Sequence, residues 1–101
     1  MLASFSVAPA DAGESLSAQV ARIIDIIDRS GLPYRMGPME TTVEGGYDEV
    51  MELVKKCHLE MRSVSRRVLT TIRIDDREGA EGRLEGKIES VEQRLGREVK
   101  R

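Results

Sequence analysis

The sequence has 101 residues, about the size of one ordinary domain, and residues 1–101 are predicted to form a single domain with one modest core. Hydrophobic residues make up 40% of the chain and aromatic residues only 3%, so aliphatic side chains must fill the core, and rings that could stack on nucleic-acid bases are scarce. The 16 basic and 18 acidic residues are interspersed, and no segment reaches the roughly 18 consecutive apolar residues of a membrane span, which argues against nucleic-acid and membrane partners.

The chain opens with a strand pattern followed by a helix pattern. Over residues 1–8, apolar side chains alternate with serines, which is the period of a strand with one buried face. From Ser15 onward, apolar residues recur at helical spacing until Gly31 and Pro33 provide a cap and a stop. The apolar face of this predicted helix carries Leu16, Val20, Ile23, Ile24 and Ile27.

Residues 32–36 and 39–45 are predicted to form a β-hairpin, because Gly37 and Pro38 between them mark a tight connection. After the glycines at positions 45 and 46, Asp48 is the candidate N-cap of a second amphipathic helix. The apolar side of that helix is predicted to carry Val50, Leu53, Val54, Cys57 and Met61.

A fourth strand and a third helix complete the predicted elements. Residues 66–75 are rich in β-branched side chains that alternate in polarity, as in a strand. From Ala80 to Gly96, apolar residues recur at helical spacing. The apolar stripe of this last helix consists of Leu84, Ile88, Val91 and Leu95.

The order βαββαβα predicts an α+β fold, a ferredoxin-like βαββαβ sandwich with an additional C-terminal helix. In this arrangement an antiparallel sheet carries both central helices on one face and leaves the other face bare. Strand periodicity assigns to the helix-covered face Phe5, Val7, Met39, Thr41, Val43, Val68, Ile72 and Ile74. It assigns to the bare face Ser4, Ser6, Glu40, Thr42, Glu44, Leu69, Thr71 and Arg73. Such a face suits plain solvation, a polar pocket or a wet subunit interface.

Two segments resemble the small thiamine-binding protein family: "GPMETTVEG" at residues 37–45 resembles its signature, and "RRVLTTIRIDDR" at residues 66–77 resembles its last core strand. The likeness extends over residues 1–93. It implies a ferredoxin-like fold, dimers or tetramers assembled through the sheets, and binding of thiamine or its hydroxymethylpyrimidine half. The matching positions are Ser6, Pro9, Pro38, Met39, Thr41, Thr42, Glu44, Gly45, Arg67, Thr71, Asp75 and Arg77.

The chain departs from the family pattern at two places. Glu40 stands where the family often has glycine, and residues 9–15 replace a more compact turn. A bulky anion at Glu40 would narrow a pocket or add a countercharge, so the ligand could differ from the family's usual one.

Thiamine combines an aminopyrimidine with a cationic thiazolium, so its host needs carboxylates, hydroxyls and an apolar lining. With the resemblance, this chemistry predicts a ligand site formed by Ser6, Met39, Thr41, Thr42 and Glu44. Glu44 is expected to anchor the heterocycle, with Thr42 and Ser6 as hydrogen-bond partners and Met39 as apolar lining. The alternative is a structural or regulatory oligomeric module that uses the same face for protein contacts and has no thiamine ligand.

No catalytic arrangement is evident. Cys57 and His58 are adjacent, but neighbours on a helix diverge by about 100°, so Cys57 is expected to fill the core and His58 to be solvated. Asp75 and Asp76 are expected to cap or solvate a turn rather than bind a metal. We therefore expect a non-catalytic protein without metal or cofactor. The single cysteine and the lack of a basic leader agree with a cytoplasmic location.

Overall fold

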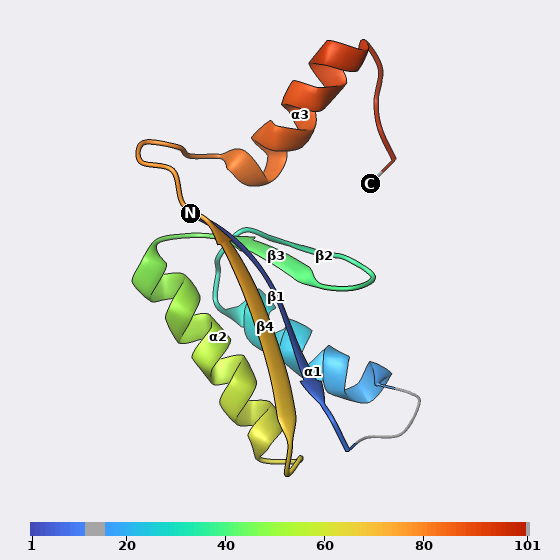
Figure 1. The fold of residues 1–101 in the computed structure, drawn as a ribbon, viewed down its shortest axis with the longest axis vertical. Coiled ribbons are helices and arrows are strands. Elements are labelled where there is room, and N and C mark those ends of the chain that lie inside the picture. Colours follow the sequence, from blue (N-terminus) through green and yellow to red (C-terminus); the bar gives the residue numbers. More distant parts are fainter. Residues whose placement is uncertain (12–15, 101) are drawn as a thin grey trace.

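The computed structural model describes residues 1–11 and 16–100, and its elements follow the predicted order (Figure 1). They are β1 (Leu2–Pro9), α1 (Ser17–Arg29), β2 (Tyr34–Met36), β3 (Thr41–Glu44), α2 (Tyr47–Arg62), β4 (Val68–Asp75) and α3 (Arg83–Leu95). The predicted start of the first helix at Ser15 lies outside the described residues.

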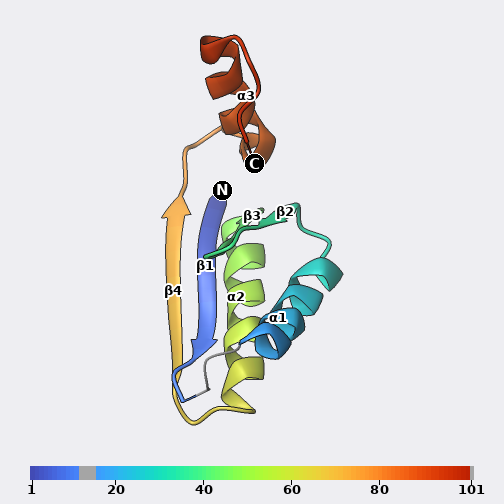
Figure 2. The same ribbon diagram turned by 90° about the vertical axis from the view of Figure 1, so that its right-hand side faces the viewer.

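The four strands form one sheet in the order β2-β3-β1-β4, and every neighbouring pair is antiparallel. The central strand β1 pairs Leu2 with Glu44 of β3 on one side and Phe5 with Ile72 of β4 on the other. Figure 2 shows α1 and α2 together on one face of this sheet, with the opposite face bare. The predicted ferredoxin-like α+β arrangement is therefore confirmed.

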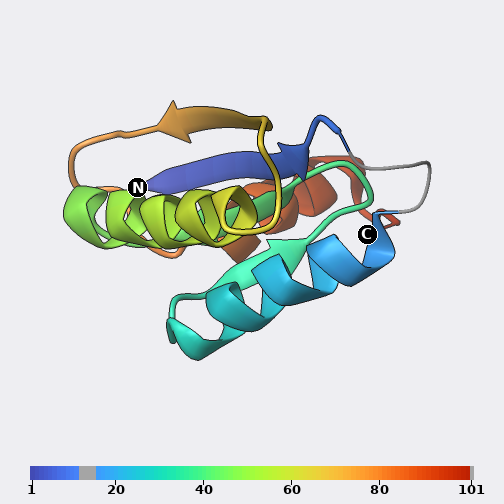
Figure 3. The ribbon, with the colours of Figure 1, turned by 90° about the horizontal axis from the view of Figure 1, so that it is seen from below.

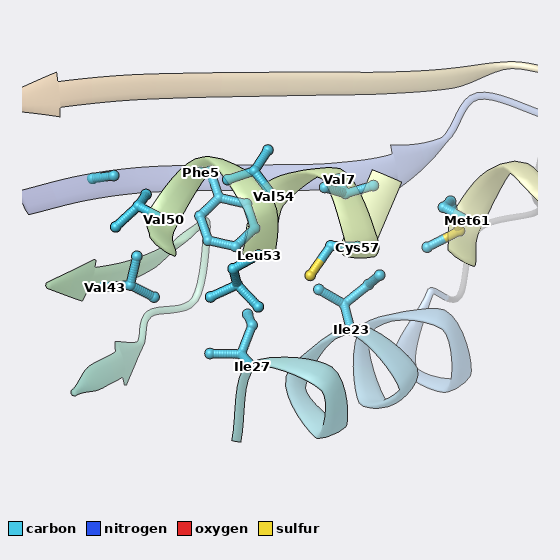
Figure 4. Packing of buried hydrophobic residues seen from close by; sticks show 11 residues of the cluster. Phe5, Val7, Ile23, Ile27, Val43, Val50, Leu53, Val54, Cys57 and Met61 are labelled. Atoms are coloured by element: carbon cyan, nitrogen blue, oxygen red, sulfur yellow. The ribbon is translucent and has the colours of Figure 1, made fainter. Parts of the chain in front are cut away.

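The core lies between the sheet and the two helices, with Phe5 at its centre (Figure 4). Alternation along β1 and β3 turns one set of side chains inward, and the apolar stripes of α1 and α2 meet that set. The buried residues are Ala3, Phe5, Val7, Ile23, Ile27, Val43, Val50, Leu53, Val54, Cys57 and Met61. The predicted apolar face of the second helix is thus confirmed in full.

Two residues assigned to the helix-covered face are exposed rather than buried. Met39 is 87% exposed, because the Gly37 N–H donates to the Glu40 carbonyl at 2.9 Å and this turn delays the start of β3 to Thr41. Ile74 has the inward parity but is exposed, since it lies on the edge strand. Figure 3 shows β4 at the rim of the sheet, on the side away from α1.

The start of α2 also differs from the prediction. Gly46, not Asp48, is the N-cap, and Asp48 lies in the first helical turn. The Glu49 carboxylate accepts the Gly46 N–H at 3.0 Å, which satisfies a backbone donor at the helix start. Asp48 then contributes its negative charge to the positive end of the helix dipole.

Helix α3 extends beyond the end of the sheet and buries no residue against the core (Figure 1). It starts at Arg83 rather than Ala80, after Gly82 in a left-handed conformation. Its apolar stripe is consequently only partly covered, because Leu84 and Ile88 are half-buried while Val91 and Leu95 are exposed. Among the described residues, no helix is long and apolar enough to cross a bilayer.

Candidate functional site

A pocket opens where β1 and β3 stop pairing. Strand β3 is short, so its register with β1 ends at the pair Phe5 and Thr41, and the connection at residues 37–40 turns away from the rest of β1. The opening left there, here called the hairpin pocket, has a volume of about 100 Å³. It is lined by Phe5, Ser6 and Val7 of β1, by Val20, Ile23, Ile24 and Ile27 of α1, and by residues 36–41 of the hairpin.

The hairpin pocket has an apolar floor and a few polar lining residues. Side chains of α1 and β1 that also belong to the core make up the floor. The polar residues that line the pocket are Ser6, Glu40 and Thr41, with Thr41 buried on the helix side of the sheet and the Glu40 carboxylate bonded to Arg73 on the bare side. An apolar surface with a few convergent polar groups is the usual composition of a small-molecule site.

The Glu40 carboxylate is held by two groups from the bare face. Its Oε1 accepts a hydrogen bond from Arg73 Nη2 at 2.6 Å. Hydrogen bonds from Ser4 and then from Arg73 hold the pKa of Glu40 below its ordinary value of 4.5. The carboxylate is therefore ionised at neutral pH.

The two threonines of the signature point to opposite faces of the sheet. Thr41 is buried on the helix side and lines the hairpin pocket. Thr42 lies on the bare face, where its hydroxyl donates to Ser4 Oγ at 3.4 Å. Alternation along β3 causes this separation, so the pair cannot act on one ring from the same side.

Glu44 lies at the end of β3 opposite the hairpin, apart from Ser6 and Met39. Its Oε2 accepts the Arg83 N–H at 2.9 Å and its Oε1 accepts the Leu84 N–H at 3.1 Å, both at the start of α3. Partial burial alone would raise the pKa of Glu44, but the backbone amides at the start of α3, together with the positive N-terminus, outweigh it and hold the pKa below 4.5. The structure thus gives Glu44 a structural contact that the sequence pattern did not suggest.

Of the predicted site residues, the structure brings Ser6, Met39 and Thr41 together and leaves Thr42 and Glu44 outside the pocket. Sequence analysis missed the α1 side of the site, because Val20, Ile23 and Ile24 were assigned only to the core. Glu40 was singled out as a departure from the family pattern but was not included in the predicted site. Strand periodicity assigns Glu40 and Ser6 to the same face of the sheet, and this was the signal that could have indicated that they lie close together.

The remaining reactive side chains are engaged elsewhere. Cys57 is fully buried, and desolvation raises the pKa of its thiol to about 11, so it is an inert core residue as expected. His58 was expected to be solvated, but it is half-buried and its Nδ1 lies 2.6 Å from Thr70 Oγ1. Asp75 pairs with Lys87 of α3. Within the part of the chain that the structure describes, no three His, Cys, Asp or Glu side chains cluster as metal ligands would.

The family model described as "Thiamine-binding protein" matches residues 3–92. A UPF0045 protein of Methanothermobacter thermautotrophicus is 37% identical over 83 residues, which is 80% of this chain and 84% of the relative. The UPF0045 protein YqgV of Bacillus subtilis is 35% identical over 86 residues, covering 80% and 83% of the two chains.

Solved structures show the same fold. The hypothetical protein MJ1052 of Methanocaldococcus jannaschii superposes with a TM-score of 0.83 at 28% identity, covering 89% of this chain and 93% of that one. A Thermotoga maritima protein, named as a candidate thiamine biosynthesis/salvage protein, superposes with a TM-score of 0.79 at 30% identity, covering 89% and 96%. The similarity therefore spans the whole βαββαβ unit.

Proposed function

The chain belongs to the thiamine-binding protein family, and we propose that it is a non-catalytic binding protein for thiamine or its hydroxymethylpyrimidine half. The observation that carries this proposal is the hairpin pocket, which is lined by apolar side chains together with Ser6, Glu40 and Thr41. An aminopyrimidine has flat apolar faces and an edge of donors and acceptors, so it needs both kinds of surface.

We assign the ring contacts to Ser6, Met39 and Thr41. The Thr41 hydroxyl, on the helix side, can donate to a ring nitrogen or accept from the exocyclic amine, and Ser6 lines the pocket from β1. The exposed Met39 side chain is flexible and polarisable, so it can fold over a bound ring. Thr42 and Glu44 have other partners, Ser4 and the start of α3 respectively.

We further propose that the protein works as a dimer or a tetramer built from dimers. The hairpin pocket, at about 100 Å³, is smaller than the roughly 300 Å³ at which ligand pockets begin, so a second copy would complete it. The bare face carries Leu69, which is 55% exposed, and α3 exposes the apolar side chains of Val91 and Leu95. The same surfaces favour the alternative function, an oligomeric interaction module without a thiamine ligand.

Calorimetric titration of the protein with thiamine and with hydroxymethylpyrimidine tests the binding proposal. Ser6→Leu, which places bulk in the pocket lining, should weaken binding at least tenfold without lowering the melting temperature. Thr71→Leu is the matched control, because Thr71 pairs with Ser6 on the neighbouring strand but does not line the pocket. If neither compound binds the wild type at millimolar concentration, the binding proposal fails and the interaction module takes its place.

A further inference from the structure

We propose that Glu40 determines the ligand specificity of the hairpin pocket by favouring a positively charged heterocycle over a neutral one. The inference rests on the proposed function, because it concerns the same pocket and the same class of ligand. Among the described residues that line the pocket, Glu40 alone carries a charge. Among the lining residues, this carboxylate is therefore the group that can discriminate ligands by charge.

The turn before β3 fixes the position of Glu40. The Gly37 N–H donates to the Glu40 carbonyl at 2.9 Å, and a Cβ at position 37 would lie only 2.7 Å from that carbonyl oxygen. A glycine at position 37 is thus required for the turn to close this tightly. The closed turn fixes the backbone of Glu40, which lines the pocket and whose side chain is 28% exposed.

The ion pair with Arg73 orients the carboxylate but does not cancel its effect on a ligand. The Glu40 side chain is 28% exposed, whereas Arg73 is 77% exposed and extends from the edge strand into water. Water therefore screens the more exposed guanidinium more than it screens the carboxylate. A carboxylate also has about four acceptor positions, so one bond from Arg73 leaves room for a donor or cation of the ligand.

The competing explanation is that Glu40 and Arg73 only tie the hairpin to β4. A tie of this kind would support the pocket for every ligand equally. Charge selection instead acts on the ratio of two affinities, which makes the two explanations separable.

The test is calorimetric titration of the wild type, Glu40→Gln and Arg73→Gln with thiamine, which is cationic, and with hydroxymethylpyrimidine, which is neutral at pH 7. The measured quantity is the ratio of the two dissociation constants, neutral ligand over cation. Glu40→Gln keeps the shape of the side chain and should reduce this ratio by about threefold to tenfold, the range for a partly screened charge contact. Arg73→Gln should leave the ratio unchanged or raise it. Added salt should reduce the wild-type ratio but not that of Glu40→Gln.

The outcomes separate the inference from the proposed function. If Glu40→Gln weakens both ligands equally, so that the ratio of dissociation constants does not change, the ion pair is only a tie and the inference is wrong. If Glu44→Gln changes the ratio and Glu40→Gln does not, the anchor predicted from the sequence is correct and the inference is also wrong. If the wild type binds neither compound, both the proposed function and this inference are wrong. A shifted ratio in Glu40→Gln alone supports both.

Discussion

Replacing Glu44 should loosen α3 while leaving the rest of the fold intact. Its carboxylate accepts the Arg83 and Leu84 N–H groups, two of the unpaired donors at the start of the helix, and the N-cap residue Gly82 has no side chain to do so. Loss of a capping side chain costs typically about 1 kcal/mol.

A loss of this size has a local consequence, because α3 buries nothing against the core. A 13-residue helix is marginal in isolation, so its anchors largely determine how often it opens. About 1 kcal/mol corresponds to roughly a fivefold change in the opening equilibrium. Glu44→Ala should therefore speed amide exchange in α3 about fivefold, and Glu44→Gln, which keeps one acceptor oxygen, should have a smaller effect.

Hydrogen exchange followed by NMR measures this directly, with amides of β1 and α2 as internal references. Glu89→Gln, an exposed carboxylate change within α3 itself, is the matched control and should leave exchange unaltered. Unchanged exchange in α3 of Glu44→Ala would refute the capping role. Equal acceleration in β1 would show that Glu44 supports the whole domain instead.

The same contact predicts a pH window. The folded-state pKa of Glu44 is lowered, so its contribution is complete above the ordinary value of 4.5 and is lost as the pH falls through the lower folded-state value. The measured quantity is the hydrogen-exchange protection factor of α3 amides, corrected for the intrinsic exchange rate at each pH. Below about pH 4.5 it should decrease more steeply in the wild type than in Glu44→Ala. Identical pH profiles in the two proteins would contradict the assignment.

Three further results are expected. Light scattering at micromolar concentration should return the mass of a dimer or tetramer, and a monomer mass would argue against the proposed assembly. Cys57, whose thiol pKa is about 11 and which is fully buried, should react with a thiol reagent only at the rate of unfolding, and rapid labelling of the native protein would show that the core opens there. Phe5→Ala should destabilise the fold by about 3 to 5 kcal/mol in urea titration, and a loss below about 1 kcal/mol would show that Phe5 is not central to the core.

The fold could be predicted from the sequence because its signals are local. Alternation along β1 and helical spacing from Val50 to Met61 each require only a few neighbouring residues, and both assign the inward side correctly. The positions of Met39 and the α2 cap could not be predicted in this way. A turn hydrogen bond between Gly37 and Glu40 moves the start of β3, and the Glu49 carboxylate selects Gly46 as the cap.

The candidate site was harder to predict because it depends on contacts between distant segments. Parity correctly placed Ser6, Glu40 and Thr42 on one face, yet only the register of β1 and β3 shows that the pocket opens beside Ser6 and not beside Thr42. The hydrogen bonds from Arg83 and Leu84 to Glu44 connect residues that are separated by 39 and by 40 positions in the chain. No local pattern encodes where that helix begins relative to β3.

The most direct test of the central claim is a titration of isotope-labelled protein with hydroxymethylpyrimidine, followed by backbone and methyl NMR. The account predicts saturable chemical-shift changes at Ser6, Met39 and Thr41, with little change at Glu44 and Arg83. Shifts confined to Glu44 and the start of α3, or no shifts at millimolar ligand, would contradict it.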